Sequence, residues 1–219
     1  GYYEPLIKGS RVRSAQFSWP IRGVPDDLLT IDLGEIYPDL KKYRLRGRLV
    51  GNKVVPYWSR AELDQMGERL PARTLLWASD PIELFFLQVQ GSGRVELADG
   101  SRVRLGYADQ NGQPYQSIGR WLVDKGELSL DNASMEGIKN WARANPGRLP
   151  ELLNANPSYV FFKELPASSG GPVGAQGRPL SDGRSIAVDP GAIPLGAPVF
   201  LATTAPGGER PLQRLVVAQ

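Results

Sequence analysis

Residues 88–107 have the sequence QVQGSGRVELADGSRVRLGY, and this stretch decides the fold class. The runs 94–97 and 102–105 alternate polar and apolar side chains with period two, which is typical of β-strands. Asp99-Gly100 between them is a strong signal for a tight turn. The sequence therefore predicts a β-hairpin, and a glycine-rich turn at 90–93 leads into it.

A second hairpin is predicted at 43–57, with its turn at 51–53. Arg44, Arg46 and Arg48 occupy one face of its first strand. This face could bind substrate carboxylates, or it could be a solvated or edge-protecting strand face, and we favour the second interpretation. Further short strands are predicted at the ranges 185–188, 198–202 and 212–218.

Helix start signals occur twice in the first half of the chain. Ser59 and Glu62 form a capping-box pattern. Asp80 precedes a proline and stands three residues before Glu83. Asp80 and Glu83 are also candidates for catalytic carboxylates, but capping accounts for them better. Two more helices are expected at 117–125 and 135–142, the latter with an apolar stripe that predicts burial.

The composition excludes several classes of chemistry. The 219 residues contain no cysteine and no histidine, which rules out thiol nucleophiles, disulfides and Ser-His-Asp triads, and disfavours zinc sites. Catalysis would fall to carboxylates, tyrosines, lysines or hydroxyls. We expect neither a cofactor nor a metal.

Charge and hydropathy restrict the possible binding partners only weakly. The net charge is +3, a mild excess that is compatible with an acidic polymer but does not require one. Apolar runs stop at about four residues, far below the roughly 20 of a membrane helix. No signal peptide is present, and we expect both ends of the chain to be internal to a longer polypeptide.

Several stretches contain residues suited to a saccharide groove, which needs flat aromatic faces and short polar side chains. Glycines let a ligand approach the backbone closely. The alternatives are core tyrosines with satisfied hydroxyls, plain turns at the glycines and a turn-forming aspartate at the end of a strand. The candidates are Tyr2, Tyr3, Gln90, Gly91, Ser92, Gly93, Tyr107, Tyr115, Ser117, Asn156, Tyr159 and Asp189.

The order and spacing of these stretches resemble the membrane-bound lytic transglycosylase A family, which cleaves peptidoglycan. The resemblance extends over essentially the whole chain. It rests on the stretches 1–5, 88–93, 106–109, 115–120, 156–162, 185–189 and 193–196.

The resemblance implies a mainly β fold with a few short helices. Residues 6–163 would be a smaller β-rich substrate-binding domain inserted into a double-psi β-barrel. Residues 1–5 and 164–219 would supply parts of that barrel, which is incomplete in this chain, and a substrate groove would lie between the domains. A Pro-, Gly- and Ser-rich stretch at 166–184 independently suggests a domain crossing.

The resemblance also implies the reaction, which is non-hydrolytic cleavage of the MurNAc-β-1,4-GlcNAc bond with formation of 1,6-anhydro-MurNAc. The C6 hydroxyl is the nucleophile, so one aspartate can serve as acid and then as base. The family's stretch with that aspartate follows a Val-Ala-Gln strand, and this sequence ends at Val217-Ala218-Gln219. No residue present is therefore assigned the catalytic role, Asp189 is assigned only a supporting one, and we expect this fragment alone to be inactive.

The resemblance further implies a monomer on the periplasmic side of the outer membrane of a Gram-negative bacterium, although no anchor is present in the sequence. The expected partners are peptidoglycan glycan strands and other cell-wall enzymes. Nucleic acid is not expected as a partner. Two alternatives stay open. One is a non-catalytic, expansin-like glycan-binding module. The other is a nucleic-acid-binding β-barrel, which the scattered basic residues disfavour.

Overall fold

The computed structural model describes residues 4–167, 174–204 and 210–219. Two compact units make up the chain. One is Pro5–Leu165, and the other joins Glu4 to Pro166–Gln219. Each unit is described by itself below. Strands outnumber α-helices in both units, and the helices are short, so the coarse fold class predicted from the sequence is confirmed.

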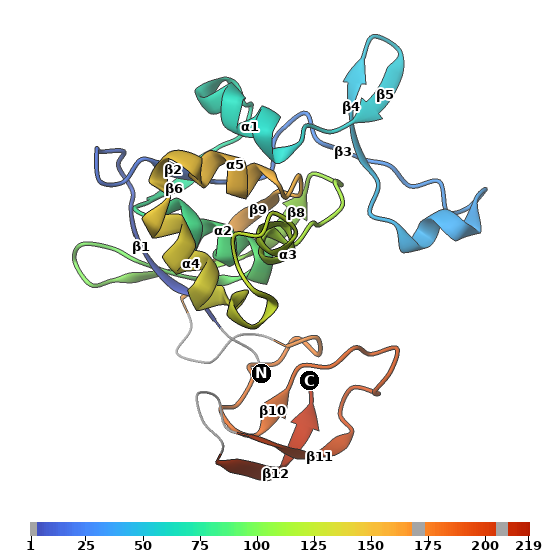
Figure 1. Cartoon of the computed structure of the whole chain (residues 1–219). Coiled ribbons are helices and arrows are strands. Elements are labelled where there is room, and N and C mark those ends of the chain that lie inside the picture. The colour runs from blue at the N-terminus through green and yellow to red at the C-terminus, as the bar shows by residue number, and fades with distance from the viewer. Residues whose placement is uncertain (1–3, 168–173, 205–209) are drawn as a thin grey trace. The chain divides into compact units, whose positions relative to one another are not determined.

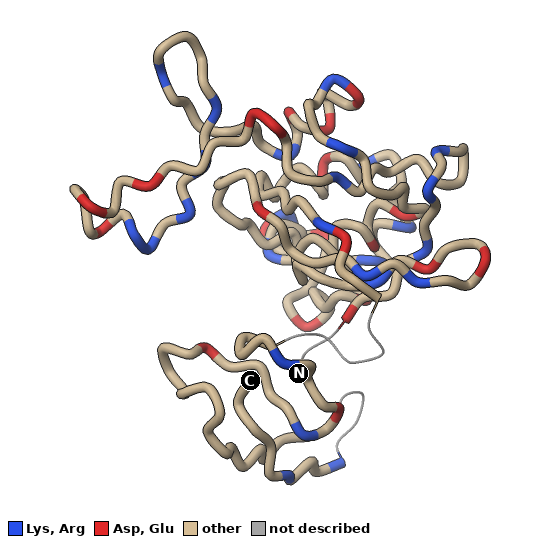
Figure 2. Tube along the Cα trace, turned by 180° about the vertical axis from the view of Figure 1, so that it is seen from behind, with Lys and Arg blue, Asp and Glu red and all other residues tan. Residues whose placement is uncertain are grey.

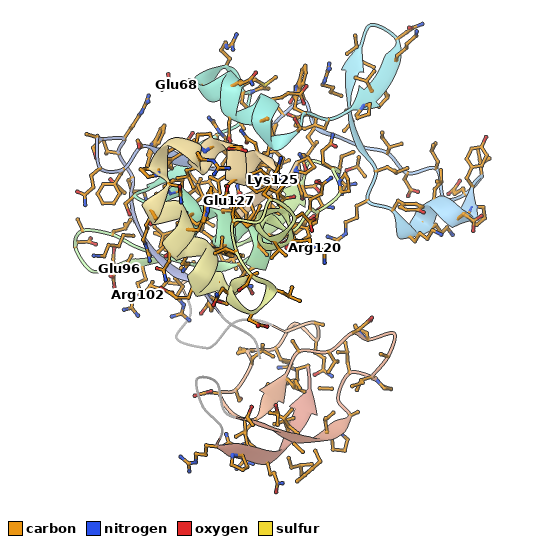
Figure 3. The ribbon with its side chains drawn as sticks, viewed as in Figure 1. Glu68, Glu96, Arg102, Arg120, Lys125 and Glu127 are labelled. Carbon is orange, nitrogen blue, oxygen red and sulfur yellow. The ribbon has the colours of Figure 1, made fainter. Side chains whose placement is uncertain are left out.

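A six-stranded sheet organises the Pro5–Leu165 unit, with strand order β2-β6-β1-β7-β8-β9. β1 and β7 pair in parallel, and all the other neighbours are antiparallel. The predicted hairpin is confirmed: Glu96 and Arg102 face each other across it and form a 3.2 Å ion pair (Figure 3). The strands are β1 Leu6–Ser10, β2 Trp19–Arg22, β6 Thr74–Ala78, β7 Gly93–Glu96, β8 Arg102–Gln110 and β9 Val160–Leu165.

The helix α2, Pro81–Gln90, packs between the sheet and three of the other helices of this unit (Figure 1). Asp80 caps it as predicted, because its carboxylate accepts the backbone N–H groups of Ile82 and Glu83. Phe85 and Phe86 pack into a cluster of helix residues, whereas Leu84 and Leu87 pack into a cluster built on the sheet. A helix buried on both sides in this way has to be apolar over most of its surface.

The helices α3, α4 and α5 pack against α2, whereas α1 packs in a separate cluster through Leu63. The capping box predicted at Ser59 and Glu62 is present at the start of α1. Glu83 pairs with Lys139 at 2.9 Å and so joins α2 to α4, which gives Glu83 a structural partner. The α-helices are α1 Arg60–Met66, α3 Ile118–Asp124, α4 Met135–Ala144 and α5 Leu149–Asn154. The 3₁₀ turns are Pro38–Lys42, Gly67–Arg69, Leu130–Asn132 and Pro146–Arg148.

A three-stranded arm extends from this unit (Figure 1). It consists of β3 Leu29–Thr30, β4 Arg46–Val50 and β5 Lys53–Pro56, so the predicted second hairpin is confirmed. The arginine face of this hairpin is only partly solvated. Arg44 is exposed, whereas Arg46 and Arg48 contact other parts of the unit, so the favoured prediction of a solvated face is wrong for these two residues. Arg46 lies 2.9 Å from the Asp109 carboxylate, and the Arg48 guanidinium lies 3.4 Å from the centre of the Trp58 ring. The body of the unit offers an acid and an aromatic ring, which arginine binds well.

The unit containing Pro166–Gln219 holds a three-stranded sheet with order β10-β12-β11. Its strands are β10 Ser185–Ile186, β11 Pro198–Thr204 and β12 Pro211–Ala218. The three predicted strands are thus present, with β10 shorter than expected. Among the described residues of this unit, the buried apolar side chains are Val216 and Ala218. No helix in the described part of the chain is long and apolar enough to cross a membrane.

Candidate functional site

The predicted glycine turn lies at the C-terminal end of α2. Gly91 has a φ of 77°, in the left-handed region that favours glycine, and it ends the helix. A Cβ placed on Gly91 would lie 3.8 Å from Cβ of Tyr107 on β8. The structure therefore brings two predicted site residues side by side. Gln90 is exposed next to them, and Ser92 is half-buried.

Gly93 has a packing role. It is buried at the start of β7, and a Cβ there would come within 2.7 Å of the carbonyl oxygen of Pro5 and overlap the Leu87 side chain. This position requires glycine because protein atoms fill the space around it. The packing explains Gly93 without a ligand.

The two tyrosines present different surfaces. Tyr107 is half-buried, and its hydroxyl accepts a 3.3 Å hydrogen bond from Nη1 of Arg44, whose guanidinium also lies over the ring. Tyr115 is 57% exposed and lines a cavity together with Gln88 and Val89. Tyr115 thus has a free surface for stacking, whereas Arg44 already covers part of Tyr107.

Two polar candidates have structural partners. Ser117 is the N-cap of α3, and its Oγ accepts the backbone N–H of Arg120 at 3.2 Å. Asn156 is buried, and its Oδ1 accepts the backbone N–H groups of Gln116 and Ser158 at 3.0 and 3.1 Å. These contacts hold the loop before α3 against the chain that leads into β9.

Tyr159 lies in the core and not on the surface. It is 4% exposed, and its ring packs against Phe161 and beneath the guanidinium of Arg60. Burial raises the pKa of its hydroxyl. The saccharide-stacking role considered for Tyr159 is therefore wrong, because no face of the ring is open.

The three remaining candidates are Tyr2, Tyr3 and Asp189. Tyr2 and Tyr3 fall outside the described residues. Asp189 belongs to the unit of Pro166–Gln219, where it is exposed and its carboxylate accepts the backbone N–H of Gly191 at 2.9 Å. This contact is the turn-forming role considered from the sequence, and the carboxylate still reaches solvent.

Sequence reasoning missed two residues that line the cavity beside Tyr115. Arg60 and Gln88 are both almost fully buried. Burial lowers the pKa of the Arg60 guanidinium. Gln88 directly follows the apolar run 84–87, and this position could have indicated a buried polar side chain. Arg60 had no comparable signal, because its position after the helix cap suggested an exposed first turn.

The described residues contain no group of three or more acidic side chains that could hold a metal ion. Basic and acidic positions are interspersed along the trace of the Pro5–Leu165 unit, without a continuous basic track (Figure 2). The turn next to the cavity therefore offers neutral hydrogen bonding and aromatic surface, and the cavity itself adds one buried cation, Arg60. This combination suits a polyhydroxylated ligand better than a polyanion.

Comparison with known protein families shows which family this chain belongs to. The model of the MltA specific insert domain matches residues 1–163, and that of the 3D domain matches residues 184–219. The chain belongs to the MltA family. Its resemblance to the membrane-bound lytic transglycosylase A family is thereby confirmed.

Curated relatives in the MltA family carry the name membrane-bound lytic murein transglycosylase A. The Escherichia coli K12 protein is 34% identical over 198 residues, covering 90% of this chain and 46% of the relative. The Vibrio cholerae protein is 31% identical over 202 residues, covering 91% of this chain and 47% of the relative. The chain thus spans about half the length of the curated relatives it matches.

Solved MltA structures share the fold over the full chain. MltA from Neisseria gonorrhoeae matches with a TM-score of 0.86 and 41% identity, covering 100% of this chain and 61% of that one. The lytic transglycosylase LtgG of Burkholderia pseudomallei matches with a TM-score of 0.73 and 50% identity, covering 100% and 59%. E. coli MltA with bound chitohexaose matches with a TM-score of 0.75 and 29% identity, covering 100% and 58%.

Proposed function

We propose that this chain is the substrate-binding part of a peptidoglycan lytic transglycosylase. The observation that carries the proposal is the match of the MltA specific insert domain to residues 1–163. A related structure contains bound chitohexaose, a chain of linked N-acetylglucosamine units, which makes glycan strands the natural ligand class. Within the Pro5–Leu165 unit, the glycan would contact the surface around Gln90, Gly91, Tyr107 and Tyr115.

The proposed reaction cleaves the MurNAc-β-1,4-GlcNAc bond without water. A carboxylic acid protonates the leaving oxygen, the muramyl C6 hydroxyl attacks C1, and the same carboxylate then removes the hydroxyl proton. The product is a 1,6-anhydro sugar. The absence of histidine is compatible with this scheme, because a single aspartate performs both proton transfers. We assign that aspartate to none of residues 1–219, and Asp189 keeps only a supporting role.

The proposed architecture places residues 6–163 as an insert in a double-psi β-barrel, to which 1–5 and 164–219 contribute. The separate family matches and the division into two compact units support this arrangement. The names of the curated relatives support a location at a membrane, and we propose the periplasmic side of the outer membrane.

A non-catalytic glycan-binding module is the second candidate, and the exposed ring of Tyr115 serves it equally well. Nucleic-acid binding is disfavoured, because the interspersed charges of the Pro5–Leu165 unit form no continuous basic groove (Figure 2). Release of anhydro-muropeptides from murein by the complete polypeptide distinguishes the enzyme from the binder.

The 219 residues alone should bind insoluble murein and leave it uncut. The measurement is co-sedimentation with purified sacculi, combined with turbidity and product analysis by mass spectrometry. Turbidity loss above a heat-inactivated control would place a catalytic acid within this chain and overturn its assignment elsewhere. Failure to co-sediment would count against the glycan-binding proposal itself.

Gln90→Ala should weaken chito-oligosaccharide binding roughly three- to tenfold, the effect of one lost hydrogen bond. The melting temperature should change little, because Gln90 is exposed. Gln65→Ala, at an exposed position on α1, is the matched control and should leave binding unchanged. A large drop in melting temperature for Gln90→Ala would instead make Gln90 a structural residue.

A further inference from the structure

A small cavity of about 190 Å³ opens beside the C-terminal end of α2, wholly within the Pro5–Leu165 unit. Gln88 and Val89 line it from α2, Tyr115 from the loop before α3, and Val160 from β9. Arg60 and Asn156 contribute polar atoms. The volume holds several water molecules or one small functional group of a larger ligand.

Gln88 provides an unused acceptor at this cavity. The residue is 4% exposed, and its Oε1 has no hydrogen-bond partner. The other end of the amide is engaged, because the Gln88 side chain donates to the hydroxyl of buried Tyr159. This contact fixes the amide orientation and leaves the carbonyl oxygen as the free end. A buried acceptor without a partner is costly, so a ligand donor placed there gains more than it would at the surface.

Arg60 gives the cavity a positively charged wall. Its Nε and Nη2 donate to the backbone carbonyl oxygens of Asn156 and Ser158 at 3.1 and 2.7 Å. Its guanidinium lies 4.8 Å from the centre of the Phe85 ring and 5.0 Å from that of Tyr159. Within the described residues, no carboxylate lies within ion-pair distance of Arg60, although Asp64 on the same helix attracts it electrostatically. The direct contacts of the guanidinium are carbonyl oxygens and aromatic rings.

These two walls select among ligand classes. A carboxylate or phosphate would suit Arg60 but would place its oxygens against the Gln88 acceptor. An ammonium group would suit Gln88 but would be repelled by the buried guanidinium. A neutral group with a donor at one end and an acceptor at the other satisfies both walls, and a secondary amide has this arrangement. Val89 and Val160 supply apolar surface for an adjoining methyl or methylene group.

We propose that this cavity is a binding site for a secondary amide whose N–H donates to Oε1 of Gln88 and whose carbonyl oxygen faces the Arg60 wall. The acetamido group of an amino sugar and a peptide bond of a peptidoglycan stem share this chemistry. Placing the amide in peptidoglycan rests on the proposed function, whereas the amide preference itself rests on the cavity.

The first experiment compares three probes by calorimetry on the 219-residue chain. They are chitohexaose, its fully de-N-acetylated counterpart of equal length, and a free stem tetrapeptide. Gln88→Met keeps the side-chain volume and removes the acceptor. It should weaken binding of the amide-bearing ligand about three- to tenfold and leave the de-N-acetylated oligomer unaffected. Loss with chitohexaose assigns the acetamido group, and loss with the tetrapeptide assigns a peptide amide.

Asn154→Ala is the matched control. Asn154 also carries a buried, unpartnered side-chain oxygen, but the residue does not line the cavity. Asn154→Ala should leave all three affinities unchanged. An equal loss for the acetylated and de-N-acetylated oligomers in Gln88→Met would overturn the amide assignment, as would unchanged affinity for every probe.

A second measurement does not depend on any variant folding. Titration of the ¹⁵N-labelled wild-type chain with N-methylacetamide should shift the side-chain amide signal of Gln88, while the signal of Asn154 stays in place. An unshifted Gln88 signal contradicts the amide site.

If Gln90→Ala weakens glycan binding while Gln88→Met does not, the proposed function stands and the amide site fails. If no glycan binds, the proposed function fails, and the N-methylacetamide titration alone decides the amide site.

Discussion

The two units of this chain differ sharply in how much apolar surface they bury. The Pro5–Leu165 unit has three hydrophobic clusters, and α2 contributes to two of them. In the described part of the other unit, Phe200 and Leu215 face each other across β11 and β12 and are 66% and 58% exposed. Regular strand pairing is present in both units. Among the described residues, only the first unit contains a hydrophobic cluster, so hydrogen-bonded strand pairing here does not require a buried core.

Separating the two units should give the largest effect. We expect a fragment of residues 5–165 to unfold in one cooperative transition, because its clusters are internal. A fragment of residues 166–219 should show no cooperative transition, since so small a unit with so little burial gains too little to offset chain entropy. Thermal circular dichroism of both fragments checks this. A sharp melt from the second fragment would remove the contrast between the units.

Matched leucine truncations sharpen the same comparison. Leu87→Ala removes a side chain of 0% exposure from the sheet cluster and should cost about 2–5 kcal/mol of unfolding free energy. Leu215→Ala, at an exposed position, should change stability by no more than about 0.5 kcal/mol. Urea unfolding, with hydrogen exchange of β12 for the second variant, gives both values. A comparable loss of unfolding free energy for Leu215→Ala would mean that other residues cover the face of β12 that carries Leu215.

The smallest predicted effect depends on pH. Glu164 on β9 pairs with Arg11 through two contacts of 2.5 and 2.9 Å, and this hydrogen bonding lowers the pKa of the carboxyl below its ordinary value of 4.5. The contribution is therefore present above that value and is lost as pH falls through the lower folded-state pKa.

Glu164→Gln should reduce the stability of the Pro5–Leu165 unit at neutral pH by less than about 1 kcal/mol, because both partners are partly exposed. Wild type and variant should converge in acid, where the wild-type carboxyl is protonated. The check is urea unfolding of both proteins at several pH values. A difference that persists below the folded-state pKa would show that the substitution acts through packing.

Local sequence signals predicted much of the fold. The Asp99-Gly100 turn, the capping box at Ser59 and the cap at Asp80 are each set by residues within a few positions of one another, and all three are present. Such features depend on nearby chain geometry and hydrogen bonding, which are visible in a single sequence.

The failures concern contacts between distant residues. Arg46 binds Asp109, 63 positions away. The ring of Tyr159, just before β9, is covered by Arg60, the first residue of α1. A period-two pattern says which side chains share a face but not which face meets the protein. The same limit concealed Gln88, because its cavity is assembled from four separate segments.

The β4–β5 turn has a practical consequence. Nothing lies within 4 Å of a Cβ placed on Gly51, and Asn52 beside it is exposed and needs no left-handed backbone. The chain contains no cysteine. Asn52→Cys therefore introduces a single thiol at the tip of the arm, where one fluorophore or spin label can be attached without a competing reaction. The natural lack of sulfhydryl groups makes this chain a ready scaffold for site-specific labelling.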